Sequence, residues 1–327
     1  MTEKLSLLVP MYNEAEVIDP FFRRVLPILE GLGLDWEIIC VNDGSQDDTL
    51  EQLWRWHERD GRIKVINLSR NFGKERAVTA ALDLACGDAV IPMDADLQDP
   101  PELIPQMIDL WRQGFDVVNA VRASRRSDPP AKRITARLFY RLINALAETP
   151  IPSDAGDFRL LSRRVCDVLR SMRESHRFMK GMFAWVGFPT TSLTFERTPR
   201  AGGQTKWNYW RLWNYALEGI ISFSTVPLKL ASYLGLLAAL IGLSYAGFLV
   251  LRTLLFGDPV PGYPSMMTAI LFFGGVQLIF IGIFGEYIAR IHDEVKGRPI
   301  YVIDSTRGFA PATSGQPSAA SQQQSEM

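Results

Sequence analysis

Five short apolar runs alternate with segments of helical periodicity over the first 122 residues, and this alternation limits the possible folds more than any other feature of the chain. The runs are predicted to be strands, at Leu5–Val9, Glu37–Val41, Lys64–Leu68, Ala89–Met93 and Val117–Val121. The segments between them are predicted to be helices, at Glu16–Leu32, Asp48–Glu58, Lys74–Ala85 and Pro101–Arg112. Near-continuous apolar runs are typical of strands covered on both faces. We therefore expect an α/β fold with a mostly parallel sheet and helices on each side.

A polar turn follows each of these predicted strands. The turns are Pro10–Glu14, Asn42–Ser45, Ser69–Lys74, Asp94–Asp96 and the residue Arg122. Any one of them has the composition of an ordinary turn. In a parallel sheet, however, the carboxyl ends of the strands meet at one edge, where ligands bind. Five polar turns in succession at that edge indicate a binding site.

The fourth turn carries two aspartates one residue apart, Asp94 and Asp96. Two carboxylates so close together repel each other unless a cation lies between them. A hard divalent ion such as Mg²⁺ or Mn²⁺, with a diphosphate on its other side, suits such a pair. An Asp-x-Asp motif on its own is weak, and a surface turn with chance acids is the alternative.

Composition excludes several other classes of protein. The net charge of −1 gives no indication of nucleic-acid binding. Three cysteines and three histidines are scattered along the chain, which favours neither a disulfide framework nor a histidine metal site. The apolar run Leu5–Pro10 is too short for a signal peptide.

Two long stretches without a charged residue follow later in the chain. Leu230–Leu251 has 22 residues and Tyr263–Gly285 has 23, and a helix needs about 20 apolar residues to cross a bilayer. Lysines and arginines flank the outer ends of the pair, so the positive-inside rule places both termini in the cytosol. Buried helices of a soluble protein are the alternative. Glycines in both stretches allow close helix packing, including between copies of the chain.

Two further segments have the composition of structures that lie at a membrane surface. Ala131–Ala147 is predicted to be a cationic amphipathic helix, and Trp207–Tyr215 holds three of the eight tryptophans. A solvated helix and a buried aromatic cluster are the alternatives. The tail from Asp304 onward is rich in Ser, Gln, Ala and Pro and is predicted to be disordered.

Three motifs in order, PMYNE, NDGSQDDT and DADLQDPP, resemble those of the nucleotide-diphospho-sugar-binding (GT-A type) fold of family 2 glycosyltransferases. Over about residues 4 to 303 the chain resembles the polyprenyl-phosphate branch of that family, which includes dolichol-phosphate mannose synthase and the bactoprenol glucosyltransferases. One departure is Asn42, where many members have aspartate.

The resemblance implies a set of site residues. Those expected to bind a nucleotide sugar are Pro10, Tyr12, Asn13, Glu14, Asp43, Lys74, Asp94, Ala95, Asp96 and Gln98. Those expected to contact the acceptor or its phosphate are Arg122, Arg200 and Lys206. Asp157, expected in a loop at residues 154–159, would be the acceptor-side catalytic residue, acting with Asp96 and Arg200. Asp94 and Asp96 would hold the metal, with Asp96 the direct ligand.

We therefore expect a membrane-anchored, inverting glycosyltransferase of the inner membrane that transfers glucose from UDP-glucose to undecaprenyl phosphate on the cytosolic side. Another donor sugar, such as an amino-pentose, an N-acetylhexosamine or mannose, stays open. So does a different class, a non-catalytic membrane subunit of a lipid-sugar translocator. The expected parts are a catalytic core at 1–128, an acceptor-side region at 129–229, a two-helix hairpin at 230–290, a juxtamembrane segment at 291–303 and a tail at 304–327.

Overall fold

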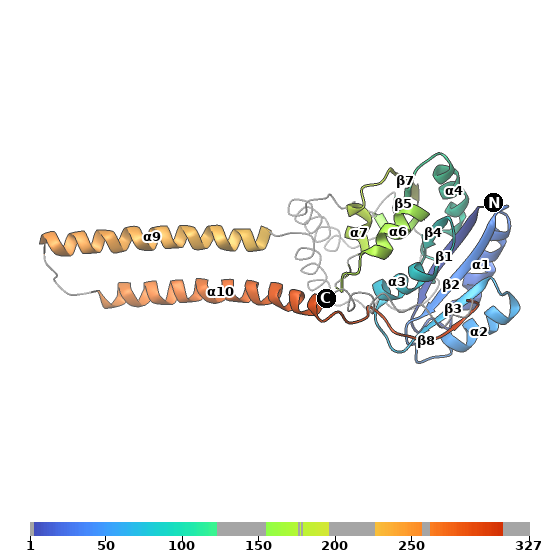
Figure 1. Ribbon diagram of the computed structural model, residues 1–327, viewed down its shortest axis with the longest axis horizontal. Coiled ribbons are helices and arrows are strands. Elements are labelled where there is room, and N and C mark those ends of the chain that lie inside the picture. The colour runs from blue at the N-terminus through green and yellow to red at the C-terminus, as the bar shows by residue number, and fades with distance from the viewer. Residues whose placement is uncertain are drawn as a thin grey trace, which may run out of the picture.

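The computed structural model describes residues 3–122, 155–175, 177, 179–195, 226–256 and 262–309. These residues form an α/β body from which two long helices project, so the molecule is elongated (Figure 1). The predicted cationic helix Ala131–Ala147 and the aromatic stretch Trp207–Tyr215 lie outside the described residues.

The predicted alternation of strands and helices is confirmed in the first half of the chain. Four parallel strands lie in the order β3-β2-β1-β4, namely β3 (Ile63–Leu68), β2 (Asp35–Asn42), β1 (Lys4–Met11) and β4 (Ala89–Pro92). In chain order, β1 is followed by α1 (Ile18–Glu30), β2 by α2 (Thr49–Arg59) and β3 by α3 (Lys74–Leu84). Strand β4 is followed by η1 (Pro101–Leu103) and α4 (Ile104–Arg112).

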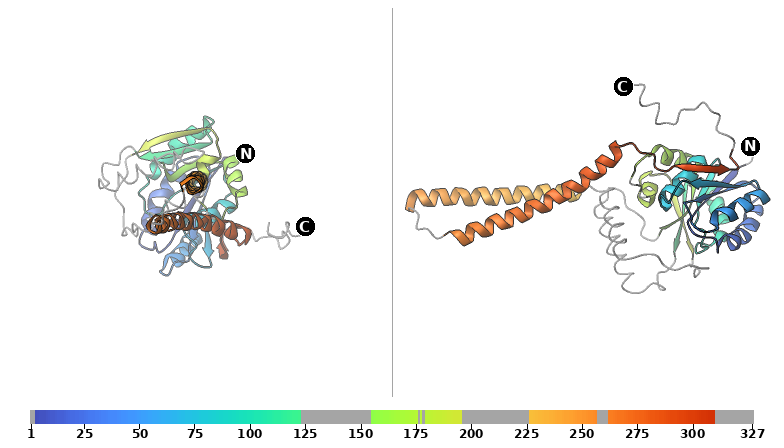
Figure 2. Two further views of the ribbon diagram at one scale, coloured as in Figure 1. Left: turned by 90° about the vertical axis from the view of Figure 1, so that its left-hand side faces the viewer. Right: turned by 90° about the horizontal axis from the view of Figure 1, so that it is seen from below.

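Both faces of these strands are buried, which explains why their sequences do not alternate between apolar and polar residues. Successive residues of a strand point to opposite faces. Leu7 of β1 packs in the cluster that includes residues of α1, α2 and α4, whereas Leu8 packs in the cluster that includes residues of α3. Helices therefore cover the sheet on both sides (Figure 2).

The other half of the sheet mixes directions. Strand β6 (Ala155–Ser162) runs antiparallel between β4 and β5 (Val117–Arg122), and β7 (Thr190–Phe195) adds a parallel edge strand beside β5. The prediction of a loop at residues 154–159 is therefore wrong for 155–159. Phe158 and Leu160 point into one core cluster and Leu161 into the other, so the segment is a buried strand. Helix α6 (Arg163–Ser171) follows it.

Two antiparallel helices, α9 (Val226–Phe256) and α10 (Tyr263–Val295), extend away from the sheet (Figure 1). The two predicted spans, Leu230–Leu251 and Tyr263–Gly285, lie inside these helices. Among the described residues one stretch, Phe272–Val295, is long and apolar enough to cross a membrane, with a mean hydropathy of 1.6 and no burial inside the protein.

After α10 the chain returns to the sheet and ends its described part in strand β8 (Ile303–Arg307). This strand pairs antiparallel with β3 at the edge of the sheet. The prediction that the tail is disordered from Asp304 is therefore wrong for its first residues, because a neighbouring strand edge satisfies their backbone groups. The tail beyond residue 309 lies outside the described residues.

Candidate active site

The turns after β1 and β2 form one unit at the carboxyl edge of the sheet. The amide of Asn13 donates to Oγ of Ser45 (2.9 Å), and the amide of Gln46 donates to Oδ1 of Asn13 (2.8 Å). Asn13 has a φ of +53°, a left-handed conformation that asparagine adopts more readily than most residues. The amide of Glu14 donates to Oγ1 of Thr49 (2.9 Å) at the start of α2. The structure thus brings together the first two of the predicted donor-binding turns.

Asp43 joins this unit to the turn after β3. Its buried carboxylate accepts the amide of Phe72 at Oδ1 (2.7 Å) and the amide of Gly73 at Oδ2 (2.9 Å). Burial raises the pKa of Asp43, and the two amides with Arg70 and Arg76 oppose this rise only in part. The carboxylate of Asp43, which is predicted to bind a nucleotide sugar, therefore also holds the turn that leads into α3.

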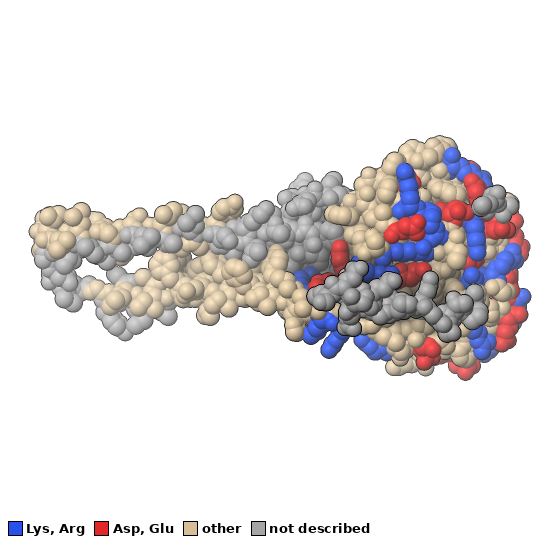
Figure 3. Space-filling view, viewed as in Figure 1, with Lys and Arg blue, Asp and Glu red and all other residues tan. Residues whose placement is uncertain are grey.

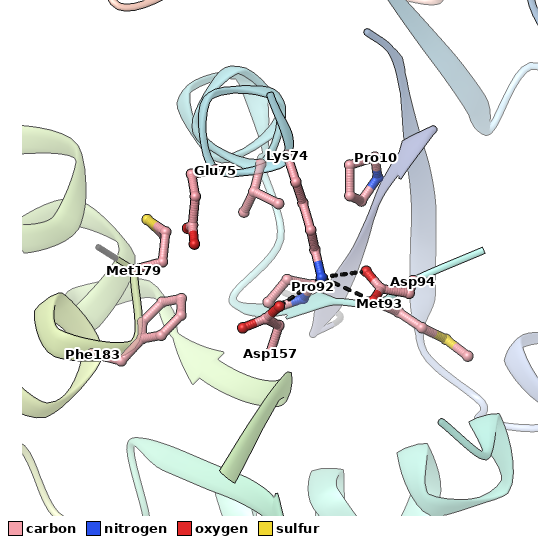
Figure 4. A pocket seen from close by; sticks show the side chains of 10 residues that line it. Pro10, Lys74, Glu75, Pro92, Met93, Asp94, Asp157, Met179 and Phe183 are labelled. Carbon is pink, nitrogen blue, oxygen red and sulfur yellow. Dashed lines mark hydrogen bonds and ion pairs between the residues drawn. The ribbon is translucent and has the colours of Figure 1, made fainter. Parts of the chain in front are cut away.

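Lys74, the first residue of α3, lies between two carboxylates (Figure 4). Its Nζ is 2.7 Å from Oδ1 of Asp94, just after β4, and 2.6 Å from Oδ2 of Asp157, on β6. Burial alone would lower the pKa of Lys74, but the two carboxylates outweigh it and raise the pKa well above its usual value. Lys74 is therefore an ammonium ion at neutral pH, and one cation is shared by the predicted donor-side and acceptor-side carboxylates.

A cleft surrounds this ammonium ion (Figure 4). It is lined by Pro10, Lys74, Glu75, Val78, Pro92, Met93, Asp94, Asp157, Met179 and Phe183. The sequence interpretation missed Glu75, and it missed Met179 and Phe183, which come from α7 (Met179–Trp185). Helix α7 is short and apolar, so nothing in its sequence distinguishes a cleft wall from an ordinary core helix.

The rest of the Asp94–Asp99 turn is compact and largely buried. Oδ1 of Asp96 accepts the amide of Gln98 (3.1 Å), and Leu97 between them has a φ of +56°. Ala95 and Gln98 are both buried, so their side chains present little surface to a ligand in this conformation. Asp96 itself is partly exposed at the same edge as Asp94.

Comparison with known proteins shows the family to which this chain belongs. Residues 6–170 match the family described as glycosyl transferase family 2, and residues 226–291 match the one described as the GtrB C-terminal hairpin. The chain belongs to glycosyl transferase family 2. An uncharacterized glycosyltransferase of Synechocystis sp. is 53% identical over 94% of this chain and 97% of its own. The bactoprenol glucosyl transferase of Shigella phage SfII is 47% identical over 92% of this chain and 97% of its own.

A solved structure also resembles this family 2 glycosyltransferase. The glucosyl-3-phosphoglycerate synthase of Mycobacterium tuberculosis, in complex with Mn²⁺, UDP-glucose and phosphoglyceric acid, is 20% identical. The likeness covers 67% of this chain and 77% of that one, with a TM-score of 0.46. It is too distant to carry any ligand or residue role over to this enzyme.

The carboxylates of this glycosyltransferase fit a divalent cation, because oxygens of Asp94 and Asp157 already converge on one positive charge. Within the described part of the chain no group of three or more His, Cys, Asp or Glu side chains could hold a metal. Two carboxylates with open positions suit an ion that completes its shell with ligand oxygens and water. The predicted metal pair was Asp94 and Asp96, and the structure adds Asp157 beside Asp94.

The remaining predicted residues are only partly described. Tyr12 is exposed in the turn after β1, and Arg122 is the last residue of β5. Arg200 and Lys206, which were expected to contact phosphate, lie outside the described residues.

Proposed function

We propose that this glycosyltransferase moves a glucosyl group from UDP-glucose to a polyprenyl phosphate at the cytosolic face of the inner membrane, with inversion at the anomeric carbon. The observation that carries the proposal is the convergence of Asp94 and Asp157 on one cation at the carboxyl edge of the sheet. A diphosphate leaving group and a phosphate nucleophile both need charge concentrated at a defined position, and such a site provides it.

The donor would lie along the carboxyl edge of β1, β2 and β4. The unit built from the turns after β1 and β2, together with Asp43, would hold the nucleoside, and Lys74 would contact the diphosphate. Asp94, Asp96 or both would hold Mg²⁺ or Mn²⁺. A divalent ion bound there supplies positive charge that stabilises the leaving diphosphate.

The acceptor phosphate would approach from the side of Asp157. A phosphate monoester has a second pKa of about 6 and is largely ionised near neutral pH, so its oxygen needs little help from a base. That oxygen forms the new bond to the anomeric carbon while the bond from this carbon to the diphosphate oxygen breaks, and UDP leaves. Asp157 would orient the phosphate or Lys74 more than it would take a proton. Arg122, Arg200 and Lys206 would neutralise phosphate charge.

In this proposal the hairpin brings a lipid-borne acceptor to a site that binds a water-soluble donor. We infer that α9 and α10 both span the membrane, that both termini are cytosolic, and that the segments 131–147 and 207–215 lie at the lipid interface. Chemistry at the sheet edge then takes place next to the headgroups while the prenyl tail stays in the bilayer. Self-association of the hairpin through its glycines remains a prediction.

Glucose and the bactoprenol carrier are proposed because relatives named for them are similar along nearly the whole chain.

Membranes that contain the full-length protein test this function directly. They are incubated with undecaprenyl phosphate, Mn²⁺ or Mg²⁺, and each of UDP-glucose, UDP-N-acetylglucosamine, a UDP-amino-pentose and GDP-mannose, and the extracted lipid is analysed by mass spectrometry. We expect glucosyl phosphoryl undecaprenol from UDP-glucose. A product with another donor would correct the sugar. No product with any donor, from protein that is folded, would refute the transfer and favour a non-catalytic membrane subunit.

A further inference from the structure

The strand β8 is not used by the function proposed so far, yet it lies next to the donor side of the sheet. It pairs with β3, and the amide of Ser69, just after β3, donates to the carbonyl oxygen of Val302 (3.0 Å). Strand β3 in turn pairs with β2, whose end carries the turn with Asp43. The end of the described chain is therefore two strands away from the proposed nucleoside site.

Side chains connect the two places. Nδ2 of Asn67 donates to Oδ2 of Asp304 (3.0 Å), and Nδ2 of Asn42 donates to Oδ1 of Asn67 (2.7 Å). Oδ1 of Asn42 accepts the amide of Ser45 (3.3 Å). Asn42 and Asn67 are opposite each other in the register of β2 and β3, so the backbone fixes their approach. We call Asp304, Asn67 and Asn42 the relay.

The carboxylate of Asp304, at the outer end of the relay, sets the direction of every hydrogen bond in it. An ionised carboxylate can only accept, so Asn67 has to present its NH₂ group to Asp304 and its oxygen to Asn42. Asn42 then has to present its NH₂ group to Asn67, which leaves its own oxygen for the amide of Ser45. Asn42 is 1% exposed, so solvent cannot replace a lost partner at this position.

At its inner end the relay is connected through Ser45 to the turns that follow β1 and β2. Ser45 accepts the amide of Asn13 at Oγ, and Asn13 accepts the amide of Gln46. Asp43 lies between Asn42 and Ser45 in the sequence. A change in the orientation of Asn42 would therefore reach the unit that would hold the nucleoside.

We propose that Asp304 is a positioning residue for the donor site, acting through Asn67 and Asn42 on the Asn42–Ser45 turn. This proposal rests on the proposed function, since it assumes that the turn binds the donor. It also gives a role to the departure at Asn42, because an aspartate there could not donate to Asn67. The segment that follows the hairpin is thus part of the scaffold of the catalytic site.

Exchanging the residue types of Asn67 and Asp304 tests the relay. In Asn67→Asp, the new carboxylate still accepts from Asn42 but faces the carboxylate of Asp304 without a proton between them. We expect the KM for UDP-glucose to rise about two- to tenfold, the effect of one net hydrogen bond, with kcat unchanged. Asp304→Asn keeps an acceptor for Asn67 but no longer fixes its orientation, so its effect on the KM should be smaller than that of Asn67→Asp. In the double variant, Asn at position 304 donates to Asp at position 67, and the KM should return toward the wild-type value.

A matched control and a second measurement separate positioning from general damage to β8. Arg307→Ala, on the same strand, removes only an exposed contact with Glu58 (3.3 Å) and with the ring of Trp54, and it should leave the donor KM unchanged. Hydrogen exchange of the peptide that covers residues 42–49 should be faster in Asn67→Asp and restored in the double variant.

Three outcomes would overturn the proposal: an unchanged KM and exchange rate in Asn67→Asp, no recovery in the double variant, or an equal effect of Arg307→Ala. If the wild-type protein transferred no sugar, the proposed function would fail, but the exchange rates would still decide whether the relay holds the turn.

Discussion

Lys74 and Asp157 are 83 positions apart in the sequence, yet Nζ of Lys74 lies 2.6 Å from Oδ2 of Asp157. The contact exists because β6 runs antiparallel to β4 and therefore begins at the edge where β4 ends. The same ammonium group contacts Asp94. If Asp94 and Asp157 held a divalent ion, Lys74 would lose these two partners and would be available to contact the diphosphate.

Replacing Lys74 by methionine tests this exchange of partners. Lys74→Met keeps most of the length of the side chain but removes its charge. We expect kcat/KM for the donor to fall about 10- to 100-fold, as for the loss of one hydrogen bond to a charged group. Binding of Mn²⁺ without nucleotide, measured by calorimetry, should become tighter because no ammonium competes for Asp94 and Asp157.

The control for Lys74 is Arg55→Met on α2, which loses only a surface ion pair with Glu51 (3.7 Å). It should alter neither measurement. Unchanged donor kinetics in Lys74→Met would contradict a role for this ammonium group at the diphosphate.

Asp157→Asn tests the acceptor side. The variant keeps the size of the side chain and removes its negative charge, so the acceptor phosphate or Lys74 is no longer oriented. We expect transfer to fall by about 10²-fold, the cost of misplacing a reacting group, while UDP still binds. Transfer is followed by mass spectrometry of the lipid, and nucleotide binding by calorimetry. Asp167→Asn, an exposed acid on α6 paired with Arg163 and Arg170, is the control. Near-wild-type turnover of Asp157→Asn across the pH range would rule the role out.

Chelation and two asparagine variants test the metal. A chelator should stop transfer, and added Mn²⁺ or Mg²⁺ should restore it. Asp94→Asn and Asp96→Asn should each raise the metal concentration that gives half-maximal activity, and the larger rise identifies the direct ligand. Asp109→Asn, an exposed acid on α4, should behave as wild type. Full activity in the presence of the chelator would refute metal dependence.

The donor side of the site could be predicted because its determinants are local. Each parallel strand is an apolar run followed directly by its polar turn, so the sequence itself places Asp43 and Asp94 at one edge. Asp157 could be assigned only by resemblance. Its position depends on β6, which lies between β4 and β5 although it follows both in the chain, and no local pattern indicates such an insertion.

The relay could not be predicted either, because its partners are even farther apart in the chain. Asn67 and Asp304 are 237 positions apart, and the composition of the tail indicates disorder. Strand β8 forms because the hairpin returns the chain to the free edge of β3, where a backbone partner is already in place. Pairing of this kind depends on the tertiary structure and not on the propensity of the segment.

The last prediction concerns the stability of the sheet and its dependence on pH. Glu37 of β2 is 1% exposed, and its carboxylate lies 3.0 Å from Nζ of Lys4 and 2.9 Å from Nζ of Lys64. Oε1 also accepts the hydroxyl of Ser6 (2.6 Å) and the amide of Cys86 (2.8 Å). Burial alone would raise the pKa of Glu37, but these partners outweigh it and lower the pKa from 4.5 to about 2.

Because the folded protein holds this pKa below its value in the unfolded chain, Glu37 stabilises the fold fully above about pH 4.5. The contribution is lost as the pH falls through about 2. A shift of this size corresponds to about 3 kcal/mol. Glu37→Gln should therefore lower the Tm, measured by tryptophan fluorescence in detergent, and the deficit should be greatest above pH 5 and shrink toward pH 2. Glu30→Gln, whose exposed carboxylate is 3.9 Å from Arg62, should show no such dependence. A deficit that stays constant from pH 7 to about pH 2 would mean that packing, and not the charge of Glu37, stabilises this part of the sheet.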